Sequence, residues 1–302
     1  MTVVVTGSSG FIGRHLVTAL SNRGHVVVGI DRRPGEPPAE GGEIVADLLD
    51  RDDVLETALR EATVVFHLAG CPGVRDHAPD VAQRRWRDNV LATERVLAAI
   101  PLHTPLVVTS SSSVYGGASG RGCRETDALK PRGGYAHSKV AVERFCAERI
   151  AAGGNVAIAR PFTVAGEYQR DDMAFAQWIE SARRGDPLRI LGSPARTRDV
   201  TDVRDVARAL VLLAERGVTG PVNIGTGRAH RLDALAAVVA EVTGAQMAID
   251  VVPADPDEVL HTRADTTKLR RLTGFAPRTD LRALIARQYA AARADAHAAA
   301  RA

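Results

Sequence analysis

The chain has 302 residues, enough for one large domain or two modest ones. Hydrophobic residues make up 45% and charged residues 25%, proportions that exclude disordered, fibrous and membrane-spanning proteins. The formal net charge is +3, from 39 Lys and Arg against 36 Asp and Glu. Because the basic residues are spread singly or in pairs among the acids, and aromatic residues are only 4%, we expect no nucleic-acid partner.

Cysteine usage and hydropathy indicate the compartment. Cys71, Cys123 and Cys146 are an odd number with no Cys-x-x-Cys pair, so we expect reduced, packed thiols and neither a disulfide framework nor a metal site. No apolar run reaches the ~18 residues of a membrane span. The N-terminal segment has no signal-peptide pattern. We expect a cytoplasmic protein without a membrane partner.

The first half of the chain alternates buried-strand patterns with helical patterns. Short β-branched, apolar runs predict these strands: Thr2–Val5, Val26–Ile30, Val64–Leu68, Leu106–Ser110 and Val156–Ala159. Helical spacing predicts these helices: Phe11–Asn22, Val54–Leu59, Asp88–Ala99 and Ser138–Ala151. The alternation predicts an α/β fold, a doubly wound parallel Rossmann sheet with helices on both faces.

After about residue 163 the sequence becomes richer in Pro, Gly and Arg and its strands become shorter. We predict a dinucleotide-binding domain over residues 1–163, to which residues 200–228 return, and a smaller substrate-binding lobe mainly over residues 164–302. Helices are predicted at Asp202–Glu215 and Leu232–Thr243. The Ala-rich end after about Ala290 is predicted to fray.

A glycine-rich turn joins the first strand to the first helix. Gly7, Gly10 and Gly13 leave room for a pyrophosphate on the free N–H groups at the helix N-terminus. Asp31 ends the second strand, where a carboxylate accepts hydrogen bonds from an adenosine ribose. This pattern predicts NAD rather than NADP, because a carboxylate repels a 2′-phosphate. Arg32 and Arg33 keep NADP open, since either could clamp that phosphate.

Two polar groups predict the chemistry. Tyr135 and Lys139 stand four residues apart, so a helix places them on one face, and the ammonium is expected to lower the pKa of the phenol. Such a phenol serves as a general base or acid. The strand ending at Ser110 runs into three further serines, at the carboxyl edge where parallel sheets bind ligands. One of these hydroxyls can share the substrate oxygen with Tyr135.

These features, with other motifs, resemble the extended short-chain dehydrogenase/reductases of the NAD-dependent sugar epimerase/dehydratase group. The matching motifs are Thr6-Gly-Ser-Ser-Gly-Phe-Ile-Gly13, Asp47-Leu48, His67-Leu-Ala-Gly70, Asn89, Tyr135-Ala-His-Ser-Lys139, Arg198-Asp199 and Asn223-Ile-Gly-Thr-Gly227. The resemblance implies that Ser111, Tyr135 and Lys139 are catalytic. It implies NAD contacts from Gly7, Ser9, Gly10, Phe11, Ile12, Gly13, Asp31, Arg32, Asp47, Leu48, Leu68, Ala69, Gly70, Asn89, Ser110, Tyr135, Lys139, Pro161 and Thr163.

Three further segments carry a narrower resemblance: Arg160-Pro-Phe-Thr-Val-Ala-Gly166, Gln169-Arg-Asp-Asp-Met173 and Pro72-Gly-Val-Arg75. Within the group they most resemble UDP-glucuronate 4-epimerases. Dehydratases of the group carry Asp-Glu, and decarboxylases a Glu, directly after the catalytic hydroxyl, where this chain has Ser112 and Ser113. Arg75 or Arg170 is expected to hold a sugar carboxylate, which suits the planar fork of arginine. The substrate residues implied are Pro72, Gly73, Arg75, Ser111, Ser112, Ser113, Tyr135, Phe162, Thr163, Arg170 and Arg198. Relatives are often dimers, so a homodimer is expected.

The chain also departs from the family pattern. The usual Arg-x-Gly-Asp is replaced by Asp255-Pro-Asp-Glu258, which puts an acid where a diphosphate-binding cation is expected. Ala165 replaces a usual Tyr, and Gly133-Gly134 precede the catalytic Tyr. A glycoside or sugar nucleoside without a diphosphate is therefore a second candidate substrate. The chain could also act as a 4-ketoreductase or as a noncatalytic dinucleotide sensor.

Overall fold

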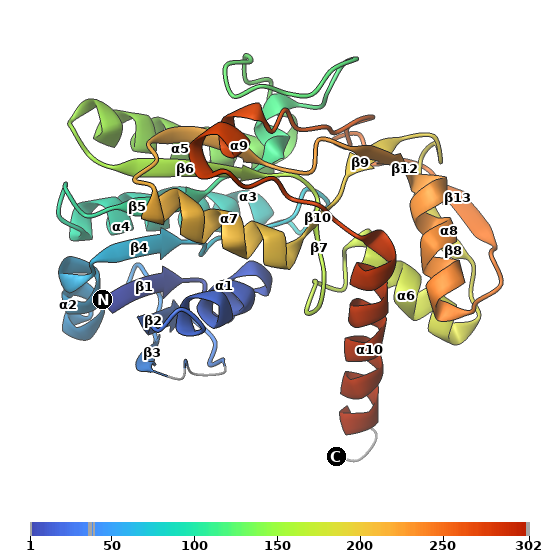
Figure 1. Cartoon of the computed structure of the whole chain (residues 1–302), viewed down its shortest axis with the longest axis horizontal. Helices are drawn as coiled ribbons and strands as arrows, with labels where there is room; N and C mark the ends of the chain where they lie inside the picture. The colour runs from blue at the N-terminus through green and yellow to red at the C-terminus, as the bar shows by residue number, and fades with distance from the viewer. Residues whose placement is uncertain (1, 36–37, 39, 300–302) are drawn as a thin grey trace.

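A seven-stranded, wholly parallel sheet forms the centre of the computed structural model, which describes residues 2–35, 38 and 40–299 (Figure 1). The strand order is β11-β6-β5-β4-β1-β2-β3. The direction of winding therefore reverses between the neighbouring strands β1 and β4, and the chain crosses the sheet from β3 to β4. The strands are β1 (Thr2–Thr6), β2 (Val26–Asp31), β3 (Gly41–Val45), β4 (Val64–His67), β5 (Leu106–Thr109), β6 (Val156–Pro161) and β11 (Gly220–Ile224). This arrangement confirms the predicted doubly wound Rossmann fold.

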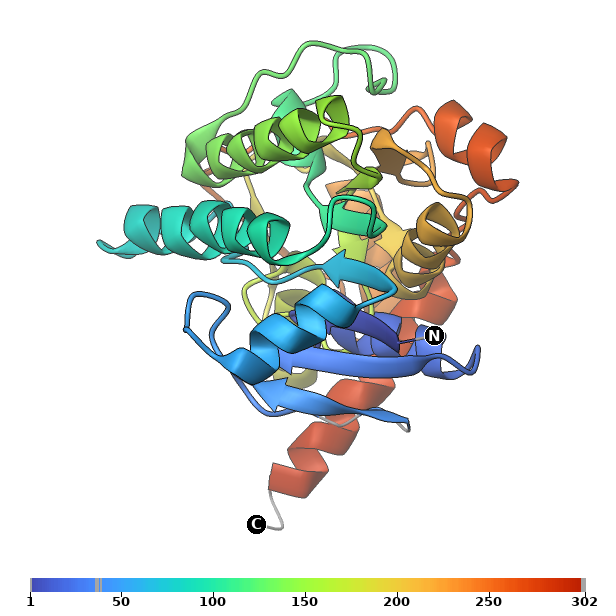
Figure 2. The same ribbon diagram turned by 90° about the vertical axis from the view of Figure 1, so that its left-hand side faces the viewer.

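Helices cover both faces of the sheet (Figure 2). The valines of β1 are buried because a parallel sheet covered on both faces exposes neither side of its central strands. One hydrophobic core lies under α1 (Phe11–Ser21) and α7 (Val203–Glu215). The opposite core lies under α2 (Asp53–Glu61), α4 (Ala92–Ala99) and α5 (Gly133–Ala151). The three cysteines are buried and free, Cys146 within this second core.

A separate core forms the smaller part of the molecule, at the right of Figure 1. Its elements are α6 (Ala174–Arg184), β8 (Leu188–Leu191), α8 (Leu232–Thr243), β13 (Ile249–Val252) and α10 (Leu281–Ala299). Phe175 packs edge-on against Trp178, with ring centroids 5.5 Å apart. Short strands connect this part with the sheet: β7 (Val164–Ala165), β9 (Thr197–Asp199), β10 (Thr201–Asp202) and β12 (Ala229–Arg231).

Several element boundaries differ from those predicted. The sequence patterns missed β3 and β11, which are the two edges of the sheet. β3 begins with two glycines and β11 with Gly-Pro, a composition typical of turns that an edge strand nevertheless tolerates. Fraying was predicted after Ala290, and the structure continues α10 as a helix to Ala299; residues 300–302 lie outside the described residues, so fraying there stays a prediction. None of the helices in the described part of the chain is long and apolar enough to cross a membrane.

The helix predicted at Asp88–Ala99 begins earlier and contains a wider turn. α3 (Val81–Arg85) runs into a π-helical turn at Trp86–Leu91 and then into α4. α5 likewise begins at Gly133 rather than Ser138, which puts Tyr135 in its first turn. Both differences lie at the carboxyl edge of the sheet, where parallel sheets bind ligands.

Candidate functional site

The turn between β1 and α1 is shaped to admit a diphosphate. Gly7 has a φ of +73°, and a Cβ there would lie 2.7 Å from the Ala69 nitrogen. A Cβ on Gly13 would lie 2.0 Å from the Gly7 carbonyl oxygen. The N-cap residue of α1, Gly10, offers no side-chain hydrogen bond, so the first-turn N–H groups remain available. These residues therefore fit the dinucleotide predicted from the sequence.

Around the end of β2, charged residues are arranged as an NAD site requires. Asp31 accepts hydrogen bonds from the Ser9 and Arg33 backbone nitrogens, which keeps its carboxylate beside the glycine turn. The Arg32 guanidinium donates to both oxygens of Asp88, at 2.9 and 3.3 Å, and lies 3.6 Å from Asp47. Arg87 pairs with the same two carboxylates, so two arginines and two aspartates balance one another and Arg32 is not a free cation for a 2′-phosphate.

The π-helical turn directs the Asn89 side chain toward the segment that follows β4. Asn89 Oδ1 accepts from the Cys71 nitrogen at 2.8 Å, and Asn89 Nδ2 donates to the Cys71 carbonyl at 3.1 Å and to Ser138 Oγ at 2.8 Å. A Cβ on Gly70 would lie 2.4 Å from Asn89 Oδ1. One amide thus fixes the predicted cofactor wall to α5. π turns of this kind occur frequently at functional sites.

Tyr135, Lys139 and Ser111 come together at the carboxyl edge of β5. Lys139 Nζ donates to the Thr109 carbonyl oxygen at 3.0 Å and lies 5.9 Å from the centre of the Tyr135 ring. Burial lowers the pKa of Lys139 to about 8. Ser111 caps the 3₁₀ turn Ser112–Tyr115, accepting a hydrogen bond from the Ser113 nitrogen at 3.1 Å.

The electrostatics of Tyr135 differ from the prediction. We expected Lys139 to lower the pKa of the phenol, but burial raises that pKa in the protein alone. A hydrogen bond with Ser111 and the nearby charge of Arg170 act in the lowering direction. Lys139 is not among the main groups that act on this pKa, and its ammonium donates to the carbonyl oxygen of Thr109.

Ser110, a predicted cofactor residue, has its side chain directed elsewhere. Its hydroxyl is buried and donates to Glu143 Oε1 at 2.5 Å. Glu143 forms a buried ion pair with Arg160, with Nη2 2.6 Å from Oε2, and Arg160 in turn donates to the Tyr115 hydroxyl. The Ser110 hydroxyl therefore belongs to a network that joins α5 to β6 and is not open to a cofactor.

Three other residues that were predicted to contact the cofactor or the substrate have buried side chains. Phe162 as a whole is 1% exposed, its ring stacks on Tyr115 and its backbone nitrogen donates to the Ile224 carbonyl oxygen, so this predicted substrate residue is not open to a ligand. The Leu48 side chain is part of the core under α2. The buried Ser113 hydroxyl has no hydrogen-bond partner among the described residues.

The predicted substrate arginines lie around carboxylates. Arg75 Nε and Arg198 Nη2 each lie 2.8 Å from a different oxygen of Glu258. Arg196, which the sequence analysis missed, lies 3.6 Å from the same carboxylate and keeps Nε and Nη1 without a hydrogen bond in the described structure. Three arginines against one glutamate leave this cluster positively charged. Arg170 is paired separately with Asp172.

The acidic segment Asp255-Pro-Asp-Glu258, which replaces the usual Arg-x-Gly-Asp, has specific partners. His77 Nε2 lies 2.5 Å from Asp255 Oδ2, and Glu258 pairs with the arginine cluster. Gly133, the first residue of α5, has a φ of +70°, and a Cβ there would lie 2.3 Å from Asp257 Oδ2, which explains the glycine at this position. Asp255 and Glu258 thus do not stand as free anions over the site.

Arg85 is a second site residue that the sequence analysis missed. Its side chain is buried and donates to the carbonyl oxygens of Gly73, at 2.7 Å, and Asp76, at 3.1 Å. A Cβ on Gly134 would lie 3.1 Å from Arg85 Nη1, and the charge of Arg85 acts on Tyr135. In the sequence it is one of an adjacent Arg-Arg pair, a pattern typical of a solvated surface.

Comparison with known proteins identifies the family. Residues 3–225 match the model of the NAD dependent epimerase/dehydratase family. The chain belongs to that family. The Bacillus subtilis (strain 168) protein YtcB, described as an uncharacterized UDP-glucose epimerase, is 30% identical over 93% of this chain and 95% of its own length.

Two solved structures superimpose closely on the chain. MoeE5 in complex with UDP-glucose and NAD is 39% identical, has a TM-score of 0.88 and aligns over 98% of this chain and 100% of its own. The UDP-glucuronic acid 4-epimerase from Bacillus cereus, in complex with UDP-glucuronic acid and NAD, is 30% identical and has a TM-score of 0.89. The alignment covers 97% of this chain and 99% of the epimerase. Other matching family members are named as decarboxylases or as a dehydratase, so membership alone leaves the reaction open.

Proposed function

We propose that this family member is an NAD-dependent sugar 4-epimerase whose substrate is UDP-glucuronate or a closely related nucleotide sugar. The observation that carries the proposal is the cluster of Tyr135, Lys139 and Ser111, followed by Ser112 and Ser113. The cluster contains the acid and base that alcohol oxidation needs. It has serine hydroxyls where the eliminating and decarboxylating relatives carry carboxylates.

The proposed reaction begins with proton transfer from the C4 hydroxyl to the Tyr135 phenolate. When bound, NAD supplies the acceptor for the C4 hydride and later returns it. The Ser111 hydroxyl donates to the same substrate oxygen, which orients it toward Tyr135. The resulting 4-keto sugar turns over in the site, and Tyr135 gives its proton back as C4 is reduced on the opposite face. C4 is inverted with no net oxidation.

The raised pKa of Tyr135 means that the phenol is mainly neutral in the protein alone. The proposed role of Lys139 is therefore to hold the site in place through Thr109. Tyr135 must lose its proton to solvent before it can act as the phenolate that begins the proposed reaction.

Two sets of positive charge support an acidic nucleotide sugar: the single Arg170, and the cluster of Arg75, Arg196 and Arg198. The charge of Arg170 acts on Tyr135, so this guanidinium lies near the reacting end, where a carboxylate on C5 would sit. Holding that carboxylate fixed matters because a 4-keto acid of this kind readily loses carbon dioxide. The cluster of Arg75, Arg196 and Arg198 has charge left over after pairing with Glu258, which suits a diphosphate.

The experiment is incubation of the purified protein with UDP-glucuronate and NAD, followed by proton NMR. Formation of the C4 epimer without added reductant is the expected result. Product only from a phosphate-free glucuronoside would favour a substrate without a diphosphate. A product that forms only with stoichiometric NADH would favour a 4-ketoreductase. Carbon dioxide release would assign the chain to the decarboxylating branch.

A further inference from the structure

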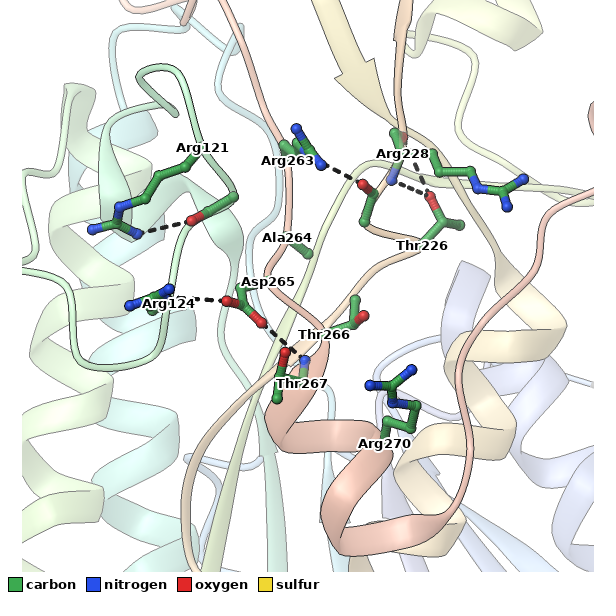
Figure 3. A pocket seen from close by; sticks show the side chains of 12 residues that line it. Arg121, Arg124, Thr226, Arg228, Arg263, Ala264, Asp265, Thr266, Thr267 and Arg270 are labelled. Atoms are coloured by element: carbon green, nitrogen blue, oxygen red, sulfur yellow. Dashed lines mark hydrogen bonds and ion pairs between the residues drawn. The ribbon is translucent and has the colours of Figure 1, made fainter.

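An arginine-rich pocket lies outside the proposed active site, between the turn after β11 and the start of α9 (Thr267–Thr273) (Figure 3). Its volume is about 490 Å³, within the range of ligand pockets. Its lining comes from three separate chain segments: Arg121, Gly122, Arg124, Thr226, Gly227, Arg228, Arg263, Ala264, Asp265, Thr266, Thr267 and Arg270. The proposed substrate arginines Arg75, Arg170 and Arg198 are not among them.

The lining carries an excess of positive charge. Arg121 forms two hydrogen bonds with Asp127, and Arg124 lies 3.2 Å from Asp265. Arg263 donates only its Nε, to the Gly227 carbonyl oxygen at 3.0 Å. Those contacts leave the Nη groups of Arg263 open.

Arg228 and Arg270 are also open. Within the residues that the structure describes, neither guanidinium has a hydrogen bond or an ion pair. In the view of Figure 3, Arg228 and Arg263 lie above, and Arg270 below, the space beside Thr226 and Thr266. Two segments of the lining, residues 226–228 and 263–270, therefore contribute three unneutralised guanidinium groups to this pocket.

The walls of the pocket are held in place by one buried carboxylate. Asp199 is 0% exposed and accepts hydrogen bonds from the backbone nitrogens of Thr226, Gly227 and Ala264, at 2.9, 3.0 and 2.9 Å. The two segments that carry Arg228 and Arg263 are thus fixed to each other before any ligand binds. A preformed site loses less entropy on binding than a mobile one.

We propose that this pocket is a second anion site, which binds a small ligand through a di- or triphosphate group. Guanidinium forks match phosphate oxygens, and the hydroxyls of Thr266 and Thr267 add further donors. None of the described lining residues is aromatic, so the pocket offers no ring on which a base would stack. The site recognises the phosphates and not a nucleobase, and it does not depend on the proposed epimerase activity.

The test is isothermal titration of the protein with inorganic pyrophosphate. The pocket variant combines Arg228→Gln, Arg263→Gln and Arg270→Gln. The matched control removes the same charge from the smaller part of the molecule, by Arg183→Gln, Arg184→Gln and Arg282→Gln. These three pair with Glu180 or Glu241 at the surface. A third protein, Arg198→Gln, weakens the arginine cluster at Glu258.

The pocket variant is expected to bind pyrophosphate about tenfold more weakly or worse. The matched control should stay within about twofold of the unmodified protein. Arg198→Gln removes a residue of the proposed active site, so it can lose a binding event there but should keep the one at the pocket. The proposal is overturned if the unmodified protein does not bind, if the pocket variant binds equally well, or if the control weakens as much. It is also overturned if Arg198→Gln alone removes binding, because the anion then occupies the proposed active site.

Discussion

Tyr135 and Lys139 have distinct roles in the proposed reaction, and each predicts a separate measurement. Tyr135→Phe removes the hydroxyl that takes the C4 proton. We expect kcat to fall by about 10²–10⁴-fold, the usual contribution of general acid–base catalysis. The variant should still bind NAD, because the substitution leaves the glycine-rich turn between β1 and α1 unchanged. Tyr168→Phe, at a half-exposed tyrosine, is the control. Unchanged turnover of UDP-glucuronate by Tyr135→Phe would show that another group moves the proton.

Lys139 predicts a pH-dependent stability. Its pKa falls from 10.5 in the unfolded chain to about 8 in the fold, because the ammonium is buried. Between these values the unfolded chain binds more protons, so stability from this group rises as pH increases from 8 to 10.5 and is lowest below pH 8. The full change is about 3 kcal/mol.

Urea unfolding of the natural protein and of Lys139→Met, at about pH 8 and pH 10, measures this effect. The natural protein should gain stability relative to the variant over that interval. Parallel pH profiles would mean that the ammonium is not desolvated in the fold.

At the level of single residues, the sequence predicted the reacting groups better than their neighbours. Tyr135 and Lys139 were recognisable because their spacing on a helix is local. The partners of Arg75 and Arg198 were not, because Glu258 reaches them from a segment distant in the chain. Arg85 shows no local sign of burial, since only tertiary contacts distinguish it from a surface arginine.

The junction of α5 with β6 depends on the buried pair of Glu143 and Arg160. Arg160→Met leaves the carboxylate buried without its partner, and we expect a loss of about 3–5 kcal/mol of unfolding free energy. Adding Glu143→Leu should restore most of this loss, because the unpaired charge is gone. Denaturant unfolding of both variants checks the expectation. A single variant as stable as the natural protein would show that the pair is not desolvated.

Among the elements, those in the centre of the sheet were predictable and the edges were not. Central strands are buried on both faces, so their apolar runs identify them. β3 and β11 are edges with glycine or proline, and their strand conformation comes from pairing with β2 and β6. The π turn was also missed, because its apolar spacing resembles an ordinary helix. The domain boundary near residue 163 stays a prediction.

For the molecule as a whole, Glu258 joins three arginines from distant segments into one cluster, and its removal predicts a change in ligand affinity. Glu258→Gln leaves Arg75, Arg196 and Arg198 without their shared carboxylate. We expect UDP to bind about tenfold more tightly, because the anion no longer competes with the glutamate. Thermal stability should fall, since three cations then repel one another.

Calorimetric titration with UDP and a melting curve measure both effects. Glu215→Gln, an exposed carboxylate paired with Arg23 at 3.7 Å, is the matched control. If Glu258→Gln binds UDP no better than the control, the arginine cluster does not hold the diphosphate.

The central claim is that hydrogen leaves C4 and returns to C4 within one binding event. UDP-glucuronate carrying deuterium at C4, incubated with the protein and NAD in ordinary water, tests this most directly. NMR and mass spectrometry should find a C4 epimer that keeps its deuterium at C4, with no added reductant needed. An epimer that has lost the deuterium would contradict the proposed oxidation and reduction at C4.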